Sequence, residues 1–286
     1  MNSADHESDP TQSDKAETIA LEAQRLEASG DLGGAVGLLS SALQGGYDHP
    51  GLWHNLGNLL LTLESWREAI DAFDHAVSKG FPSESNRGLA YEHIGQLDKA
   101  FLDYSAALAR DSEDLVALVN LGTLELSRHN LPQAKERLEQ AASQDPTANW
   151  QLADVYSQMG QPQAAIHALE RAIAAGEARA HLDRAVLIAE TTPYEDVSAD
   201  FEAAIRAGAQ GARRQFAVYL DTHGKPELAL EVAEAGIAEG DASCFAPAAV
   251  VSESLGLKER AVRYYRAAIE SGETAYEDDL QNLLSQ

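Results

Sequence analysis

The chain has 286 residues, of which 21 are basic and 46 acidic, so its formal net charge is −25. A charge of this sign and size repels nucleic acids and anionic membrane surfaces, so we expect neither as a partner. Because no signal segment opens the chain and no apolar run reaches the length of a membrane helix, we expect a soluble, cytoplasmic protein.

The first residues differ in character from the rest of the chain. Residues 1–15 are polar and lack apolar periodicity, which predicts a disordered acidic tail. From residue 16 on, apolar side chains recur at helical spacing, and Gly30-Asp31 marks a turn between two helices. Residues 16–43 therefore read as a first helical pair.

The stretch from Trp53 to Ala76 repeats this pattern more strongly. Its first half places large residues beside Gly57, and its second half places Ala69 and Phe73 on one helical face. Small residues at Gly57 and Ala69 let two helix backbones approach closely. We expect Trp53 and Trp66 to pack within this pair.

Small residues keep this register along the chain. One series falls at Ala35, Ala69, Ala100, Ala134, Ala165, Val197, Ala229 and Ala261, with spacings of 31 to 34 residues. A second series lies seven residues later, at Ala42, Ala76, Ala107, Ala141, Ala172, Ala204, Gly236 and Ala268. A third lies twelve residues earlier, at Ala23, Gly57, Gly88, Gly122, Ala153, Ala185, Ala217 and Ala249. Three markers in phase over eight units predict a repeat array rather than one large domain.

The later units carry their own start and stop signals. In the sixth, Thr192-Pro193-Tyr194-Glu195 forms a capping box that predicts a helix start. Units five to eight end at Gly176, Gly208, Gly240 and Gly272, which suit left-handed helix stops. In the eighth, Pro247 either kinks the first helix or lies in the first turn of a helix that begins late. Residues 275–286 are predicted to form a single capping helix with a polar outer face.

The second unit resembles the tetratricopeptide repeat, whose signature is W-x2-L-G-x2-Y followed by A-x3-F. Trp53, Leu56 and Gly57 match the first part, although Leu60 stands where tyrosine is usual, and Ala69 and Phe73 match the second. The resemblance implies an all-α, right-handed α-solenoid of about eight helix-turn-helix repeats over residues 16–274, closed by the capping helix. It also implies an adaptor or scaffold that binds an extended peptide segment in its concave groove.

One row of groove positions carries amides in most units. Two residues before the third marker, the chain reads Leu21, Asn55, Asn86, Asn120, Gln151, Asp183, Gln215 and Pro247. A carboxamide both donates and accepts hydrogen bonds, so such a row can pair with the backbone of an extended peptide. Family members that hold peptides in this way use Asn here, which assigns binding to Asn55, Asn86, Asn120 and Gln151, with Asn58 in support. The alternative is that these Asn side chains only support the neighbouring helix.

The other groove positions indicate the charge of the expected partner. Trp150 is either an exposed binding anchor or a side chain that fills space after Pro146. Acids outnumber bases at the assigned groove positions, with Glu17, Glu27, Glu92, Asp154, Asp183, Glu190, Asp221 and Glu253 against Arg179 and Arg214. We therefore expect a basic or neutral protein segment. Binding of a chaperone's C-terminal carboxylate is disfavoured, because the Lys and Arg that such family members need are absent.

The sequence contains no motif for catalysis. It has no phosphate-binding or dinucleotide-binding glycine loop, no nucleophile elbow and no H-E-x-x-H. The histidines are scattered and the single cysteine, Cys244, is expected to be a packing residue, so we predict no enzyme, no metal site and no cofactor. A self-assembling structural protein is the alternative to the adaptor, and a small-molecule sensor or enzyme comes third.

Overall fold

A computed structural model describes residues 12–192 and 196–285, and within these ranges every element of regular structure is a helix. The chain divides into two compact units, Met1–Asp145 and Pro146–Gln286. The predicted all-α repeat fold is confirmed. Among the described helices none is long and apolar enough to cross a membrane.

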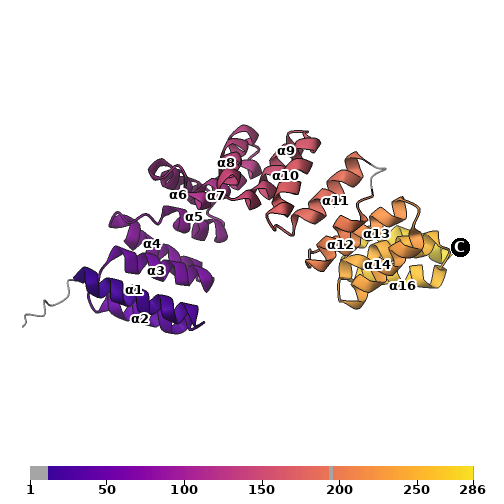
Figure 1. The fold of residues 1–286 in the computed structure, drawn as a ribbon. Coiled ribbons are helices and arrows are strands. Elements are labelled where there is room, and N and C mark those ends of the chain that lie inside the picture. The colour runs from indigo at the N-terminus through magenta and orange to yellow at the C-terminus, as the bar shows by residue number, and fades with distance from the viewer. Residues whose placement is uncertain (1–11, 193–195, 286) are drawn as a thin grey trace, which may run out of the picture. The chain divides into compact units, whose positions relative to one another are not determined.

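The N-terminal unit consists of consecutive helix pairs, in which the two helices of a pair lie side by side (Figure 1). Its helices are α1 (Gln12–Ala28), α2 (Leu32–Gln44), α3 (Pro50–Thr62), α4 (Trp66–Ser78), α5 (Glu84–His93), α6 (Leu97–Arg110), α7 (Leu115–Ser127) and α8 (Leu131–Gln144). The second helix of each pair also packs on the first helix of the next pair. Helix α1 begins inside the range expected to be the tail, so residues 12–15 are helical, while residues 1–11 lie outside the described part of the chain.

The C-terminal unit repeats the arrangement and adds short 3₁₀ turns. Its elements are η1 (Pro146–Ala148), α9 (Asn149–Gln158), α10 (Pro162–Ala174), α11 (Ala180–Thr191), α12 (Ser198–Arg206), α13 (Ala212–Thr222), α14 (Pro226–Ala238), η2 (Ala242–Cys244), α15 (Phe245–Ser254), α16 (Lys258–Glu270), η3 (Thr274–Tyr276) and α17 (Glu277–Ser285). The last helix buries Leu280 and Leu283 against the unit's core and leaves Leu284 exposed. The capping helix was predicted over 275–286, whereas α17 begins at Glu277, directly after the η3 turn.

The marker residues form the seams between paired helices. The first series is buried in all eight repeats, with Val197 the most exposed at 3%. A Cβ added at Gly57 would lie 2.4 Å from the Phe73 ring, and one at Gly88 would lie 2.8 Å from Tyr104. The missing side chain therefore makes room for a large residue on the partner helix.

The structure corrects one predicted helix start and decides between two alternatives for another. Helix α12 begins at Ser198, so Val197 caps the helix, whereas the equivalent small residue is the fourth residue of the second helix in the other repeats. The capping box expected at 192–195 lies almost wholly outside the described residues. Pro247 is the third residue of α15, so this helix begins late instead of kinking.

The glycine stops predicted for units five to eight are confirmed. Gly176, Gly208, Gly240 and Gly272 all have positive φ, between 73° and 108°. The left-handed region costs a residue with a Cβ about 1–2 kcal/mol, which explains why glycine ends these helices.

The two tryptophans of the second repeat pack, but neither is fully buried. Trp53 stacks on His75 with 4.2 Å between ring centroids and donates its indole N–H to Asp48. Trp66 stacks on His93 at 3.9 Å. Each tryptophan therefore caps a seam at the surface rather than filling the core.

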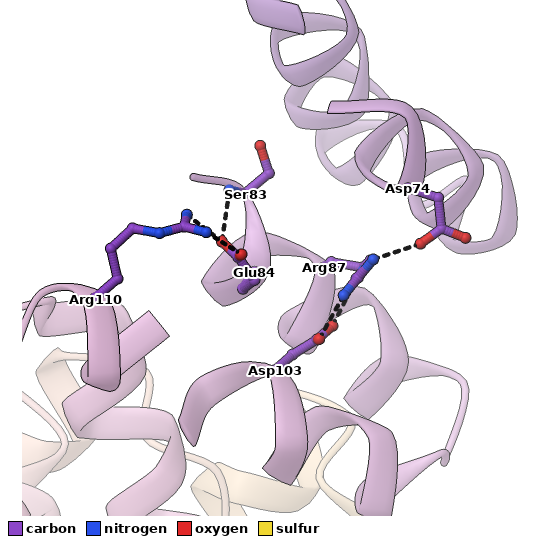
Figure 2. Close-up of polar contacts among 6 residues, drawn as sticks. All are labelled: Asp74, Ser83, Glu84, Arg87, Asp103 and Arg110. Atoms are coloured by element: carbon purple, nitrogen blue, oxygen red, sulfur yellow. Dashed lines mark hydrogen bonds and ion pairs between the residues drawn. The ribbon is translucent and has the colours of Figure 1, made fainter. Parts of the chain in front are cut away.

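Ion pairs tie neighbouring helices of the N-terminal unit together (Figure 2). Arg87 on α5 binds Asp103 on α6 through Nε and Nη2, at 2.8 and 2.7 Å, and its Nη1 binds Asp74 on α4 at 2.7 Å. Glu84 accepts from both terminal nitrogens of Arg110. In the C-terminal unit Arg184 and Asp200 form the same pair at the same repeat positions.

Candidate functional site

The predicted binding residues fall in both units. Asn55 and Asn58 lie on α3, Asn86 on α5 and Asn120 on α7, which are the first helices of consecutive repeats in the N-terminal unit. All four side chains are half-buried. Trp150 and Gln151 lie on α9, in the C-terminal unit. Each unit is therefore considered by itself.

The structure brings Asn58 and Asn86 into direct contact. Asn86 Nδ2 donates to Asn58 Oδ1 at 2.8 Å, and Asn58 Nδ2 lies 3.0 Å from His54 Nε2. An amide nitrogen only donates, so His54 Nε2 accepts and the neutral ring carries its proton on Nδ1. That N–H donates to Ser83 Oγ at 2.8 Å. The result is a chain of hydrogen bonds that runs from Asn86 on α5 through Asn58 and His54 on α3 to Ser83, which directly precedes α5.

The surroundings of His54 favour this neutral state. Its ring lies 5.0 Å from the Phe81 ring and 5.9 Å from the Phe73 ring. Burial lowers the pKa of His54 below its ordinary value, because the apolar environment disfavours the charged ring. His54 therefore orients Asn58 as an acceptor for Asn86.

The other two ladder asparagines have different environments. Asn55 makes no hydrogen bond to the described residues, so its carboxamide is unused by the fold. Asn120 lies against Tyr104, whose hydroxyl donates to Glu92 at 2.9 Å. Burial and the Glu92 carboxylate raise the pKa of Tyr104, and the hydrogen bond from Asn120 acts in the opposite direction.

In the C-terminal unit, Trp150 already has polar partners. Its Nε1 donates to Asp183 Oδ2 at 2.5 Å, and the Arg179 guanidinium lies 4.2 Å from the ring centroid. The ring also packs against a core cluster that includes Ala153. Trp150 is thus half-buried and held on one face by a cation. The Oε1 atom of Gln151 is buried and has no protein hydrogen-bond partner within the described residues.

Several of the groove charges are used within the fold. Glu92 and Glu253 accept from Tyr104 and Tyr265, each twelve residues further along the chain. Arg214 pairs with Glu273 at 3.3 Å. These contacts reduce the number of charges that are free to meet a ligand.

Sequence reasoning missed two participants of this network, His54 and Ser83. His54 and Asn58 are four residues apart on one helix, a spacing that brings side chains together and could have indicated the contact. Ser83 lies in the link before α5, where no sequence pattern points to His54. Its contact depends on how the third repeat packs on the second.

The remaining candidates for chemistry are the single cysteine and clusters of metal-ligating side chains. Cys244 is fully buried in the C-terminal core, and burial raises the pKa of its thiol to about 12, with Asp241 acting in the same direction. Its packing role is the one expected. Across residues 12–192 and 196–285, no group of three or more His, Cys, Asp or Glu side chains is arranged to hold a metal ion.

Comparisons with known proteins place the chain in a family. Tetratricopeptide repeat models match residues 21–85, 56–114 and 146–175. Together with the helix pairs described above, these matches show that the chain is a tetratricopeptide repeat protein. No curated protein matches the sequence.

Solved structures at low sequence identity share the fold. A tetratricopeptide repeat protein from Parabacteroides merdae is 19% identical, and the match covers 94% of this chain and 97% of that one with a TM-score of 0.50. The C-terminal part of a repeat-containing protein from Cytophaga hutchinsonii is 16% identical, with coverage of 93% and 99% and a TM-score of 0.53. Human IFIT1, solved as a dimer with m7Gppp-AAAA, is 14% identical, with coverage of 94% and 72% and a TM-score of 0.64. Identities this low show the fold alone.

Proposed function

We propose that this protein is an adaptor that holds an extended segment of a partner protein along the first helices of its N-terminal unit. The tetratricopeptide repeat fold generally serves protein interaction. The observation that carries the proposal is the row of half-exposed carboxamides on α3, α5 and α7. Asn55, Asn86 and Asn120 contact the segment, and Asn58 supports them.

Free hydrogen-bonding capacity supports this assignment. Asn55 has no partner among the described residues, and Asn86 uses one N–H of its amide while its Oδ1 accepts no bond from them. A peptide backbone offers one N–H and one C=O per residue, which match a carboxamide. Asn58 has both of its amide ends engaged, so it holds Asn86 in place and does not need to touch the ligand itself.

The expected partner is basic or neutral. The formal charge of −25 favours partners of opposite charge and disfavours nucleic acid and anionic membranes. In the C-terminal unit, Trp150 and Gln151, which are neighbours on α9, form a second contact region. A non-catalytic role and a cytoplasmic location complete the proposal.

An affinity pull-down from native cell extract tests the function. The triple variant Asn55→Ala/Asn86→Ala/Asn120→Ala is compared with the wild type, and far-UV circular dichroism verifies that both are folded. A double variant at the exposed Asn130 and Asn282, changed to Ala, is the matched control. We expect a partner that the wild type and the control retain and the triple variant loses.

Two other outcomes contradict the proposal. A partner held equally by the triple variant would place binding outside the asparagine row. Absence of any partner, together with a molar mass that rises with concentration in light scattering, would favour the self-assembling structural protein instead.

A further inference from the structure

We propose that a recess between the first two repeats takes the side chain of an Arg or Lys of the bound segment and thereby fixes its register. The recess lies between α1, α2 and α3, all within the N-terminal unit, and we call it the α1–α3 recess. This inference rests on the proposed function, because it assigns a specificity pocket to the same binding row. Asn55 belongs to both.

The floor of the α1–α3 recess is apolar. Ala23, Leu39 and Leu59 lie beneath it and are 3% exposed or less. Such a floor contacts methylene groups favourably and offers nothing to a polar backbone. An aliphatic stem can therefore lie across this floor while the charged end of the same side chain reaches the rim.

The rim of the recess carries polar groups without partners. Glu27 and Gln24 on α1 and Asn55 on α3 line it, and none of their side chains forms a hydrogen bond with the described residues. Asn58 also lines the recess, but its amide is already engaged. Glu27 brings a negative charge and no basic residue lines the recess, so a cationic group is the occupant that the rim neutralises.

The size of the recess selects a single side chain over a small molecule. Its volume is about 130 Å³, whereas pockets for drug-sized ligands and cofactors are about 300–1,000 Å³. Arg and Lys each combine an aliphatic stem with a cationic end that carries several donors. Those donors can meet the Glu27 carboxylate and the carbonyls of Gln24 and Asn55 together.

The test begins with selection of a phage-displayed library of twelve-residue linear peptides on the full-length chain. We expect Arg or Lys to be enriched at one fixed position of the selected peptides. The peptides are then titrated by fluorescence anisotropy, each with its basic residue intact or changed to Ala. For the wild type we expect the Ala peptide to bind about 3- to 10-fold more weakly, the range for a charge-assisted contact at a partly exposed site.

Variants of the protein assign this preference to the recess. In Glu27→Gln the two peptides should bind with nearly equal affinity. Glu22→Gln removes the same charge from an exposed position of α1, where Glu22 pairs with Arg25, and should keep the preference. A preference that survives Glu27→Gln, or selected peptides without a fixed basic residue, overturns the recess assignment and leaves the proposed function intact.

Failure of the proposed function gives a different result. Peptide binding that is unchanged in Asn86→Ala/Asn120→Ala, a variant that retains the recess residues, contradicts the asparagine row. A direct NMR titration with N-acetyl-arginine methylamide and its neutral citrulline analogue then decides the recess alone. A shift of the Asn55 side-chain amide with the arginine compound, weaker with citrulline and absent in Glu27→Gln, supports the recess even if no peptide is selected, and equal responses overturn it.

Discussion

At the scale of single residues, the absence of side chains decides how closely the paired helices pack. Gly57 on α3 faces the Phe73 ring on α4, and the ring occupies the space where a Cβ would lie. Phe73 is fully buried, so it has no free direction in which to move. The size of one residue in the first helix is thus set by its neighbour in the second.

This packing predicts the effect of adding one methyl group. Gly57→Ala should lower the free energy of unfolding by about 1–3 kcal/mol, because overpacking a well-packed core forces the surrounding groups to shift. Gly37→Ala is the matched control, since Gly37 is an exposed helical residue with no atom within 4 Å of the added Cβ. The control should gain up to about 1 kcal/mol from the higher helix propensity of Ala. Urea unfolding measures both, and equal effects of the two substitutions would refute the argument.

The buried histidine of the asparagine network predicts a pH dependence. The pKa of His54 is lowered in the folded state, so the unfolded chain binds the proton more tightly. Stability due to His54 is therefore complete above its ordinary pKa of about 6.5 and falls as the pH decreases from there through the folded pKa. Between about pH 7.5 and pH 5.5 the wild type should lose more stability than His54→Gln.

The comparison needs a matched His→Gln substitution elsewhere in the chain as a control. His167 is an exposed residue of α10, and His167→Gln should retain the wild-type pH dependence. An NMR titration of the His54 ring gives the folded pKa directly. A value at or above that of a free histidine would contradict the prediction.

At the scale of elements, one arginine links three helices of the N-terminal unit. Arg87 on α5 reaches Asp74 on α4 and Asp103 on α6, and the side chains of Arg87 and Asp103 are 18% and 9% exposed. The bidentate contact with Asp103 raises the pKa of Arg87, so the guanidinium stays charged. The pair therefore fixes the angle at which α5 meets its neighbours, at the cost of removing two charges from water.

Replacing one residue of the Arg87–Asp103 pair should destabilise the protein more than replacing both. Arg87→Met should destabilise the protein by about 2–4 kcal/mol, because Asp103 is left charged and nearly buried. The double variant Arg87→Met/Asp103→Leu should recover most of this loss. Arg25→Ala, in an exposed pair with Glu22, should change stability by less than about 1 kcal/mol. A double variant as unstable as Arg87→Met alone would show that the pair contributes net stability.

At the scale of the whole molecule, the dominant feature is the net negative charge. A formal charge of −25 makes the folded chain repel itself, and added salt screens that repulsion. Raising sodium chloride from about 20 to about 200 mM should increase Tm by about 2–4 °C, the shift that about 1 kcal/mol produces in a chain of this size. Potassium chloride should have the same effect, because screening depends on ionic strength. An unchanged or lower Tm in both salts would contradict this reading of the charge.

The sequence alone determined the repeat architecture, because the architecture follows from local pattern. Gly57, Gly88 and Gly122 each face a large residue sixteen positions further on, in the adjacent helix, so the repeat register already indicates that they must be small. The glycine stops were predictable for the same reason, since the left-handed backbone is a property of one residue. The placement of the asparagines on first helices also followed from the register.

Tertiary structure decided the details that depend on residues distant in the chain. The late start of α12 and the first-turn position of Pro247 reflect how each helix packs on its neighbours. The partners of Asn58 and Asn86, the buried Gln151 carbonyl and the α1–α3 recess likewise arise where consecutive repeats meet. Repeat spacing determines which residues face the seam between repeats. The orientation of each side chain there depends on hydrogen bonding and burial against residues about thirty positions away.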